Sequence, residues 1–203
     1  AGEDIHDFTA GLIFDVDVKD VIPEMRTVAK RVNFGIIYGM SAFGLAKDLN
    51  ISNAQAQDFI DRYFFRYPRV KEFMDQAIDQ CRQTGYAVTL MNRRRDIAEI
   101  NSKNGSIRQF AERQAINTPV QGSAADLMKL AMVRLQQQID QHSLNSRMLI
   151  TVHDEIIFDL VPAEEMVLTD IVHREMEGVM ALKVPLRVTL KKGKNWMEME
   201  KIV

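Results

Sequence analysis

Cysteine is almost absent from this sequence of 203 residues, in which Cys81 is the only one. A single cysteine forms no internal disulfide, so we expect a reducing, cytoplasmic location. Cys81 lies in helical phase with Phe73 and Ala77, which indicates a core residue rather than a nucleophile. No apolar run approaches the roughly 18 residues that cross a bilayer, and the first residues lack the pattern of a signal peptide. The sequence therefore predicts neither a membrane protein nor a secreted one.

A strong net charge is also missing. The 26 Lys and Arg residues nearly balance the 28 Asp and Glu residues, which argues mildly against a nucleic-acid partner for the chain as a whole. The cations are unevenly placed, however, because residues 61–115 carry 11 cations and only 7 anions. The densest cluster is Arg93, Arg94 and Arg95. Such a cluster is usually a solvated loop, and contact with a phosphate backbone is the alternative.

The segment RTVAKRVNFGIIYG places Arg26, Lys30, Phe34 and Tyr38 at intervals of four residues. Side chains with this spacing form one slanting row on a helix, here about 18 Å long. Two cations lie at its N-terminal end and two aromatic rings at its C-terminal end. A nucleoside triphosphate has the same polarity, with a polyanionic tail and a flat base.

An ordinary surface or core stripe is the competing interpretation of this helix. Val28, Val32 and Ile36 already supply a face that can be buried, so the two aromatic residues are not needed for the core. The segment also accepts Gly35 and Gly39, although a glycine costs up to about 1 kcal/mol inside a helix. Both details favour a ligand-binding face.

A second element, RMLITVHDEIIFDL at residues 147–160, reads as two short strands joined by a tight turn. The turn carries His153, Asp154 and Glu155. Exposed carboxylates on such a hairpin suit Mg²⁺, which takes one or two carboxylates and completes its shell with water and phosphate oxygens. Asp is also a common turn residue, so an ordinary polar turn is the alternative.

Together these motifs resemble the bacterial DNA polymerase I family, the family A DNA polymerases. The resemblance rests on RxxxKxxNFGxxYG followed, over a hundred residues later, by VHDE. GMSAFGLAKDLNIS and ERQAINTPVQGSAAD lie between them and fit the same family, as do EDIHDFTA near the start and GKNWMEM near the end. The resemblance covers essentially the whole chain, with its motifs in the family's order.

The resemblance implies a nucleotide-binding role for the helix that bears the four-residue spacing. Arg26 and Lys30 are expected to contact the triphosphate of the incoming deoxynucleotide, with Lys30 as a catalytic residue near the reacting phosphorus. Phe34 is expected to stack against the sugar and Tyr38 to lie beneath the nascent base pair. His6 matches a histidine that reaches the phosphate tail.

The resemblance also implies metal and DNA contacts. Asp154 and Glu155 match the catalytic, Mg²⁺-binding carboxylates of a two-metal site. The expected contacts with primer–template DNA come from residues of three segments, namely Arg113, Asn117, Gln121, His153, Arg93 and Arg94. Phosphoryl transfer fits this set, because it asks mainly for positioning and positive charge.

One departure from the family pattern is important. The family's other essential aspartate lies in a strand motif of the type DYSQIE, and no such motif occurs in this sequence. NRRR also replaces the GRR that the family commonly shows near position 92. We therefore expect the C-terminal portion of a polymerase, carrying half of the metal site, inert by itself and dependent on the remainder of the polymerase.

These patterns predict an α+β fold. We expect a mainly helical fingers subdomain at residues 1–115 and, at residues 116–203, an incomplete palm with a small antiparallel sheet and packed helices. Helices are expected at residues 1–14, 23–39, 41–49, 52–65, 68–85, 106–141 with a kink at Pro119, and 163–180. Strands are expected at residues 86–90, 94–100, 147–160 and 186–190.

Three other functions remain open on the residues alone. The His-Asp pairs at 6–7 and 153–154 permit a metal phosphohydrolase, although they do not explain the helix at 26–38. A non-catalytic nucleotide- or DNA-binding subunit of a split polymerase is a second alternative. A single-subunit RNA polymerase is a third, and Phe34 in its NFG context favours the deoxyribonucleotide enzyme.

Overall fold

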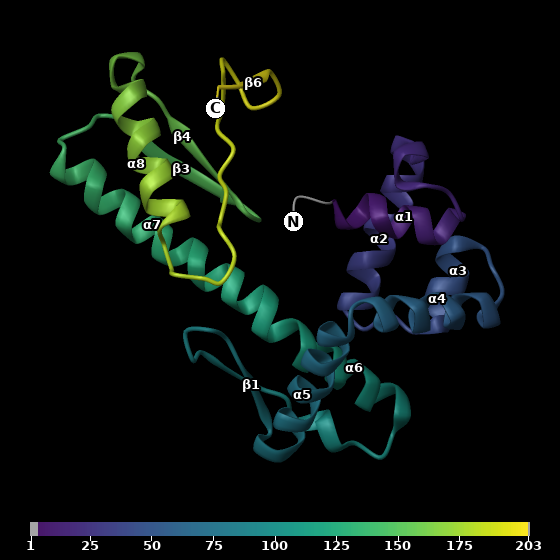
Figure 1. The fold of residues 1–203 in the computed structure, drawn as a ribbon. Coiled ribbons are helices and arrows are strands. Elements are labelled where there is room, and N and C mark those ends of the chain that lie inside the picture. The colour runs from purple at the N-terminus through teal and green to yellow at the C-terminus, as the bar shows by residue number, and fades with distance from the viewer. Residues whose placement is uncertain (1–3, 203) are drawn as a thin grey trace. The chain divides into compact units, whose positions relative to one another are not determined.

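A computed structural model describes residues 4–202 of the chain (Figure 1). The chain divides into two compact units, Ala1–Val120 and Gln121–Val203. Helices dominate, and the strands of the described residues pair into three separate two-stranded antiparallel sheets. The predicted α+β class is therefore confirmed. The assignment of residues 1–115 to fingers and 116–203 to palm stays a prediction.

The first unit consists of a helical part followed by a small hairpin and a further helix. Its helices are α1 (Ile5–Phe14), η1 (Val18–Asp20), α2 (Pro23–Ile37), α3 (Ala42–Leu49), α4 (Asn53–Arg66), α5 (Pro68–Thr84), η2 (Ala98–Asn101) and α6 (Gly105–Asn117). Strands β1 (Tyr86–Val88) and β2 (Arg94–Asp96) form the hairpin. The expected helices of this region are present among the described residues, and residues 1–3 of the helix expected at 1–14 lie outside them. Residues 98–101 form a short helix instead of continuing the strand.

Local capping explains where these helices begin. Pro23 occupies the first turn of α2, a position at which the missing N–H costs nothing. Ser41 accepts a hydrogen bond from Gly44 N at the start of α3. Ser52 and Gln55 form a reciprocal capping box at the start of α4. The helix starts predicted at positions 23, 41 and 52 are confirmed.

The core of the helical part is built from α2, α3 and α4. Val32 and Ile36 of α2 are buried with Leu45 of α3 and Tyr63 of α4, and Val28 packs against them while partly buried. The predicted buried face of α2 is therefore correct. Because this face points to the core, the side chains on the opposite side of α2 stay accessible to a ligand.

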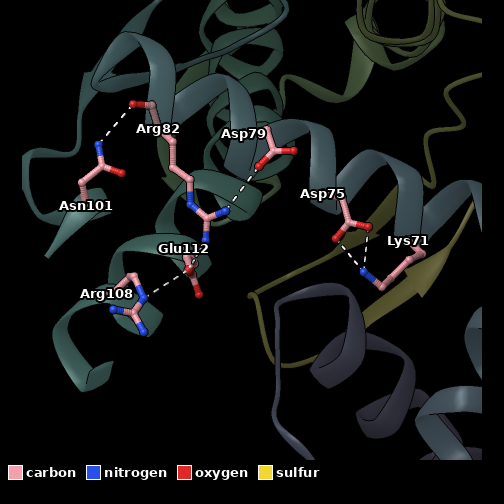
Figure 2. Close-up of polar contacts among 7 residues, drawn as sticks. All are labelled: Lys71, Asp75, Asp79, Arg82, Asn101, Arg108 and Glu112. Carbon is pink, nitrogen blue, oxygen red and sulfur yellow. Dashed lines mark hydrogen bonds and ion pairs between the residues drawn. The ribbon is translucent and has the colours of Figure 1, made fainter. Parts of the chain in front are cut away.

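A second core joins α5 to α6. Cys81 is fully buried there among residues that include Ala111 and Ala115, as expected, and burial raises the pKa of its thiol. Figure 2 shows the polar contacts at the edge of this core, where Arg82 Nη2 lies 2.7 Å from Glu112 Oε1. This ion pair links the same two helices from the solvent side.

The second unit packs one helix along another beside a hairpin. Its elements are α7 (Ser123–Gln141), β3 (Arg147–Val152), β4 (Glu155–Asp159), η4 (Pro162–Glu164), α8 (Glu165–Glu177), β5 (Lys191–Gly193) and β6 (Met199–Lys201). Helices α7 and α8 lie beside the β3–β4 hairpin (Figure 1). Leu135 of α7 and Ile171 of α8 are buried in one apolar cluster, and Ile156 and Phe158 of β4 pack against it. These contacts hold the β3–β4 hairpin on the two helices.

The kink predicted at Pro119 corresponds to a π-helical turn, Thr118–Gly122, between α6 and α7. Proline has no N–H to donate to the preceding turn, so the regular α-helical pattern cannot continue through it. Thr118 Oγ1 donates to the carbonyl of Gln114 at 2.7 Å, which satisfies one acceptor of the preceding turn. The π-helical turn therefore lies at the position where the sequence predicts a kink.

The strand predicted at Leu186–Leu190 is wrong. No strand forms there, and the N–H of Val188 donates to Glu177 Oε1 at 2.9 Å instead of to a neighbouring strand. Val188 and Leu190 still pack on the core of α7 and α8, which accounts for their apolar alternation. Pairing begins only at Lys191, where β5 meets β6. Within residues 4–202, no helix is both long and apolar enough to cross a membrane.

Candidate functional site

The face of α2 opposite the core carries the aromatic pair predicted from the sequence. Phe34 is exposed, and Tyr38, the residue that caps the C-terminus of α2, is half-buried. Their ring centroids lie 6.0 Å apart with an interplanar angle of 23°, so the two rings are stacked. The two rings thus present an aromatic surface at this end of the helix, of a kind that suits a flat ring.

The cationic end of the same face lies two turns toward the N-terminus of α2. Lys30 is exposed there. Arg26 pairs with two carboxylates of the neighbouring helix, since its Nη2 is 2.6 Å from Asp4 Oδ2 and its Nε is 3.2 Å from Asp7 Oδ1. The hydrogen bond from Arg26 also lowers the pKa of Asp4 below its usual value. An anion that binds Arg26 therefore meets two negative charges as well as one positive charge.

His6 of α1 reaches the α2 face from the side. Its ring centroid lies 5.9 Å from that of Phe34. Its Nδ1 lies 2.9 Å from Nδ2 of Asn33, a residue of α2 that is only 1% exposed. The structure thus brings His6, Arg26, Lys30 and the aromatic pair onto one region of the first unit.

The predicted metal-binding residues lie at the tip of the β3–β4 hairpin. Val152 pairs with Glu155, which leaves His153 and Asp154 as a two-residue loop, and His153 has a φ of 54°. His153, Asp154 and Glu155 are all exposed. A loop this short fixes the place of the carboxylates through the strands on both sides.

The carboxylates at the hairpin tip meet only part of what a metal ion needs from its ligands. Among residues 4–202, no group of three or more His, Cys, Asp or Glu residues is arranged to hold a metal. Mg²⁺ needs only one or two carboxylates when substrate phosphates and water fill the other positions. Asp154 and Glu155 can supply these one or two carboxylates. They do not by themselves form a metal site made wholly of protein ligands.

The residues expected to contact DNA are distributed over both units. Arg113 and Asn117 lie on α6, and Gln121 is exposed in the second unit. The guanidinium carbon of Arg113 is 5.8 Å from the ring centroid of Phe110. Asn117 Oδ1 is buried and has no hydrogen-bond partner among the described residues, so it is an acceptor that the protein itself leaves unsatisfied.

The basic cluster occupies the loop and second strand of the β1–β2 hairpin. Arg93 N donates to Thr89 Oγ1 at 3.1 Å, and the Arg94 guanidinium lies over the ring of Tyr86 at 4.6 Å. Asn92 has a φ of 60°. Asn tolerates this left-handed conformation, which glycine also favours, so the turn forms without strain at Asn92.

Sequence reasoning missed Asn33. The signal was present, because Asn33 follows Val32 at a position in phase with Ala29 and Ile36 on the buried face of α2. A polar side chain at a buried position requires a hydrogen-bond partner, and that partner is a candidate for a positioned functional group. The sequence does not reveal that the partner is His6, which lies 27 residues away.

The α2 face and the hairpin tip belong to different units, and the structure describes each by itself. Their predicted cooperation around one nucleotide stays a prediction. The phosphohydrolase alternative gains no support from the described residues, since neither His-Asp pair belongs to a three-residue metal cluster.

Comparisons with known proteins agree on one family. Residues 1–198 match DNA polymerase family A. DNA polymerase I of Caldicellulosiruptor bescii is 50% identical over 195 residues, which is 96% of this chain and 23% of that protein. DNA polymerase I of Treponema pallidum is 47% identical over 193 residues, or 95% of this chain and 19% of that protein.

A solved structure is similar as well. It is described as the POL domain of Pol1 from M. smegmatis in complex with DNA primer-template and dNTP. The similarity has a TM-score of 0.87 at 41% sequence identity, and it covers 92% of this chain and 33% of that one. The chain thus spans less than a quarter of the length of the two curated relatives named above.

Proposed function

The chain belongs to DNA polymerase family A, and from this membership we propose that it supplies the nucleotide-binding part of a DNA-directed DNA polymerase. The reaction is template-directed transfer of a nucleotide from a dNTP to the 3′-hydroxyl of a primer, in DNA replication or repair. The observation that carries the proposal is the α2 face, where the stacked Phe34 and Tyr38 share one helix with Lys30 and Arg26.

The α2 face binds the dNTP along its length. Lys30 and Arg26 contact the triphosphate, and Lys30 stabilises the charge that develops on the phosphoryl group during transfer. Phe34 packs against the sugar, and Tyr38 lies beneath the new base pair. His6 supports the phosphate tail from α1. Because Arg26 pairs with Asp4 and Asp7, the triphosphate competes with these two carboxylates for its guanidinium.

Asp154 holds a divalent metal ion at the hairpin tip, with Glu155 as the weaker ligand. Bound Mg²⁺ supplies Lewis-acid stabilisation of the phosphate charge and makes the primer hydroxyl more acidic. The short loop between β3 and β4 gives Asp154 a fixed position relative to the strands. His153 lies next to the primer terminus.

Primer–template DNA contacts the protein through sequence-independent groups. Arg113, Asn117 and Gln121 reach the minor groove, in which every base pair presents acceptors at similar places. Arg93 and Arg94 contact the phosphate backbone from the β1–β2 hairpin. The complex of the M. smegmatis domain with DNA primer-template and dNTP supports these two kinds of partner for the present chain.

Primer extension tests the proposal directly. The protein, expressed as its gene encodes it, should extend a DNA primer on a template when dNTPs and Mg²⁺ are present. Asp154→Ala should abolish extension and leave primer–template binding largely intact. Asp159→Ala is the matched control, because Asp159 is an exposed carboxylate on β4 of the same hairpin. Normal extension by Asp154→Ala would overturn the metal assignment.

A further inference from the structure

Asn33 is a nearly fully buried amide, 1% exposed, whose three polar neighbours all lie on or beside α1. It faces Thr9, which is also buried, the backbone carbonyl of Ile5, and the ring of His6. Burying an amide without partners is costly, so these contacts decide how the amide is oriented.

The carbonyl of Ile5 fixes which end of the amide carries the donors. Asn33 Nδ2 lies 3.4 Å from the oxygen of Ile5. A carbonyl oxygen only accepts hydrogen bonds, so the group that faces it must be the amide NH₂. The opposite end, Oδ1, then accepts from the hydroxyl of Thr9 at 2.9 Å. Reversing the amide would place two acceptors against each other at Ile5.

The same NH₂ group lies 2.9 Å from Nδ1 of His6. Because Asn33 donates, His6 Nδ1 must accept. A neutral imidazole carries one N–H, and when Nδ1 is the acceptor that N–H is on Nε2. The geometry therefore assigns neutral His6 to the Nε2–H tautomer.

We propose that Asn33 is a positioning residue that holds His6 in this tautomer, so that the ring presents an N–H donor to the phosphate tail without taking up a proton. The choice of anion rests on the proposed function, whereas the tautomer rests on the contacts of Asn33 alone. An Nδ1–H tautomer would turn a lone pair at Nε2 toward the negatively charged ligand. The Phe34 ring of α2 lies next to the same imidazole, with 5.9 Å between the two ring centroids.

Nuclear magnetic resonance of ring-labelled histidines tests the tautomer in the unaltered protein. The spectrum is recorded near pH 8.5, about two units above the ordinary histidine pKa of about 6.5. His6→Gln identifies the His6 signals by removing them. The expected pattern has a protonated Nε2 and an unprotonated Nδ1. A protonated Nδ1, or averaging between the two tautomers, would overturn the proposal.

His142 provides an internal reference with the opposite assignment. Its Nδ1 lies 2.9 Å from the backbone carbonyl of Gln138, which can only accept. Neutral His142 is therefore the Nδ1–H tautomer. The two histidines should give opposite ring patterns in the same spectrum, and an Nδ1–H pattern at both would contradict the proposal.

Asn33→Asp tests the cause, because a carboxylate only accepts and requires a donor at His6 Nδ1. Neutral His6 should move to the Nδ1–H tautomer, and the KM for dNTP should rise about fivefold to tenfold with a smaller change in kcat. Asn50→Asp, at an exposed cap of α3, makes the same substitution away from His6 and should change neither.

The double variant separates positioning from a purely structural role. In the His6→Gln background, Asn33→Asp should have little further effect on KM, since the residue it positions is gone. An undiminished effect would contradict the proposal. If the protein expressed as its gene encodes it incorporates no nucleotide at all, the proposed function fails, and the tautomer of His6 in the spectrum still decides the inference.

Discussion

Gly39 lies directly against the side chain of Arg113, because a Cβ built on Gly39 would be 3.0 Å from Arg113 Cγ and 3.6 Å from Ile116 Cδ1. Gly39 also has a φ of +79°, which favours glycine. The turn after the proposed nucleotide-binding face of α2 is thus in contact with Arg113, a residue expected to touch DNA.

Gly39→Ala should lower both stability and primer–template affinity. The left-handed backbone alone costs about 1–2 kcal/mol for alanine, and the new methyl group also displaces the Arg113 stem. Gly85→Ala is the matched control, since Gly85 has a φ of +81° and open space around its Cβ. Both variants should have a lower melting temperature than the unaltered protein, whereas only Gly39→Ala should weaken DNA binding severalfold. Equal DNA affinities would show that the contact with Arg113 has no role in binding.

Asp4→Asn should tighten dNTP binding. The change removes one of the two carboxylates that pair with Arg26, and Asn still caps α1. An exposed ion pair is weak because solvent screens it, so KM for dNTP should fall only about twofold. Asp75→Asn breaks the comparable pair with Lys71 on α5 and should leave KM unchanged. A rise in KM would mean that Asp4 mainly orients Arg26 for the triphosphate.

Lys30→Ala should slow incorporation far more than it weakens DNA binding. Removing a cation that acts on the reacting phosphoryl group costs on the order of 10²-fold in rate, and Lys30 lies on the nucleotide face rather than on α6. Single-turnover incorporation and primer–template titration measure the two effects separately. Lys47→Ala, at an exposed position of α3, controls for the loss of one positive charge. Equal losses of rate and affinity would assign Lys30 to DNA instead.

Glu164→Gln should remove stability that depends on pH. Hydrogen bonds from Asn145 N and Ser146 lower the pKa of Glu164 from 4.5 to about 2. A lowered pKa in the folded state stabilises the protein above the ordinary value, and this contribution disappears as the pH falls from 4.5 toward 2. Melting temperatures of the two proteins should therefore differ at pH 7, and the difference should shrink below pH 4.5 and vanish toward pH 2. Glu200→Gln, at an exposed position of β6, should show no such convergence.

Local signals in the sequence predicted much of the fold. Ser41, Ser52 and Pro23 mark helix starts because a cap or a missing N–H acts within one turn of the chain. The apolar spacing of Val32 and Ile36 correctly identified the buried face of α2. The same reasoning failed at Leu186–Leu190, since apolar alternation reports burial on one side and does not reveal whether a partner strand is present.

The candidate site was predictable only in part. The spacing of Lys30, Phe34 and Tyr38 is local, and the exposed face it predicts is present. The contacts of Asn33 with His6 and of Arg26 with Asp4 join residues 27 and 22 positions apart. Such pairings depend on how α1 packs against α2, and a helical period carries no information about that packing.

The complete burial of Cys81 between α5 and α6 makes its thiol a natural probe of local unfolding in this core. Because no other thiol occurs in the 203 residues, a sulfhydryl reagent can modify this stretch only when those two helices separate. The rate of thiol labelling therefore measures how often the core between α5 and α6 opens. The measurement needs no engineered cysteine and leaves the exposed face of α2 unchanged.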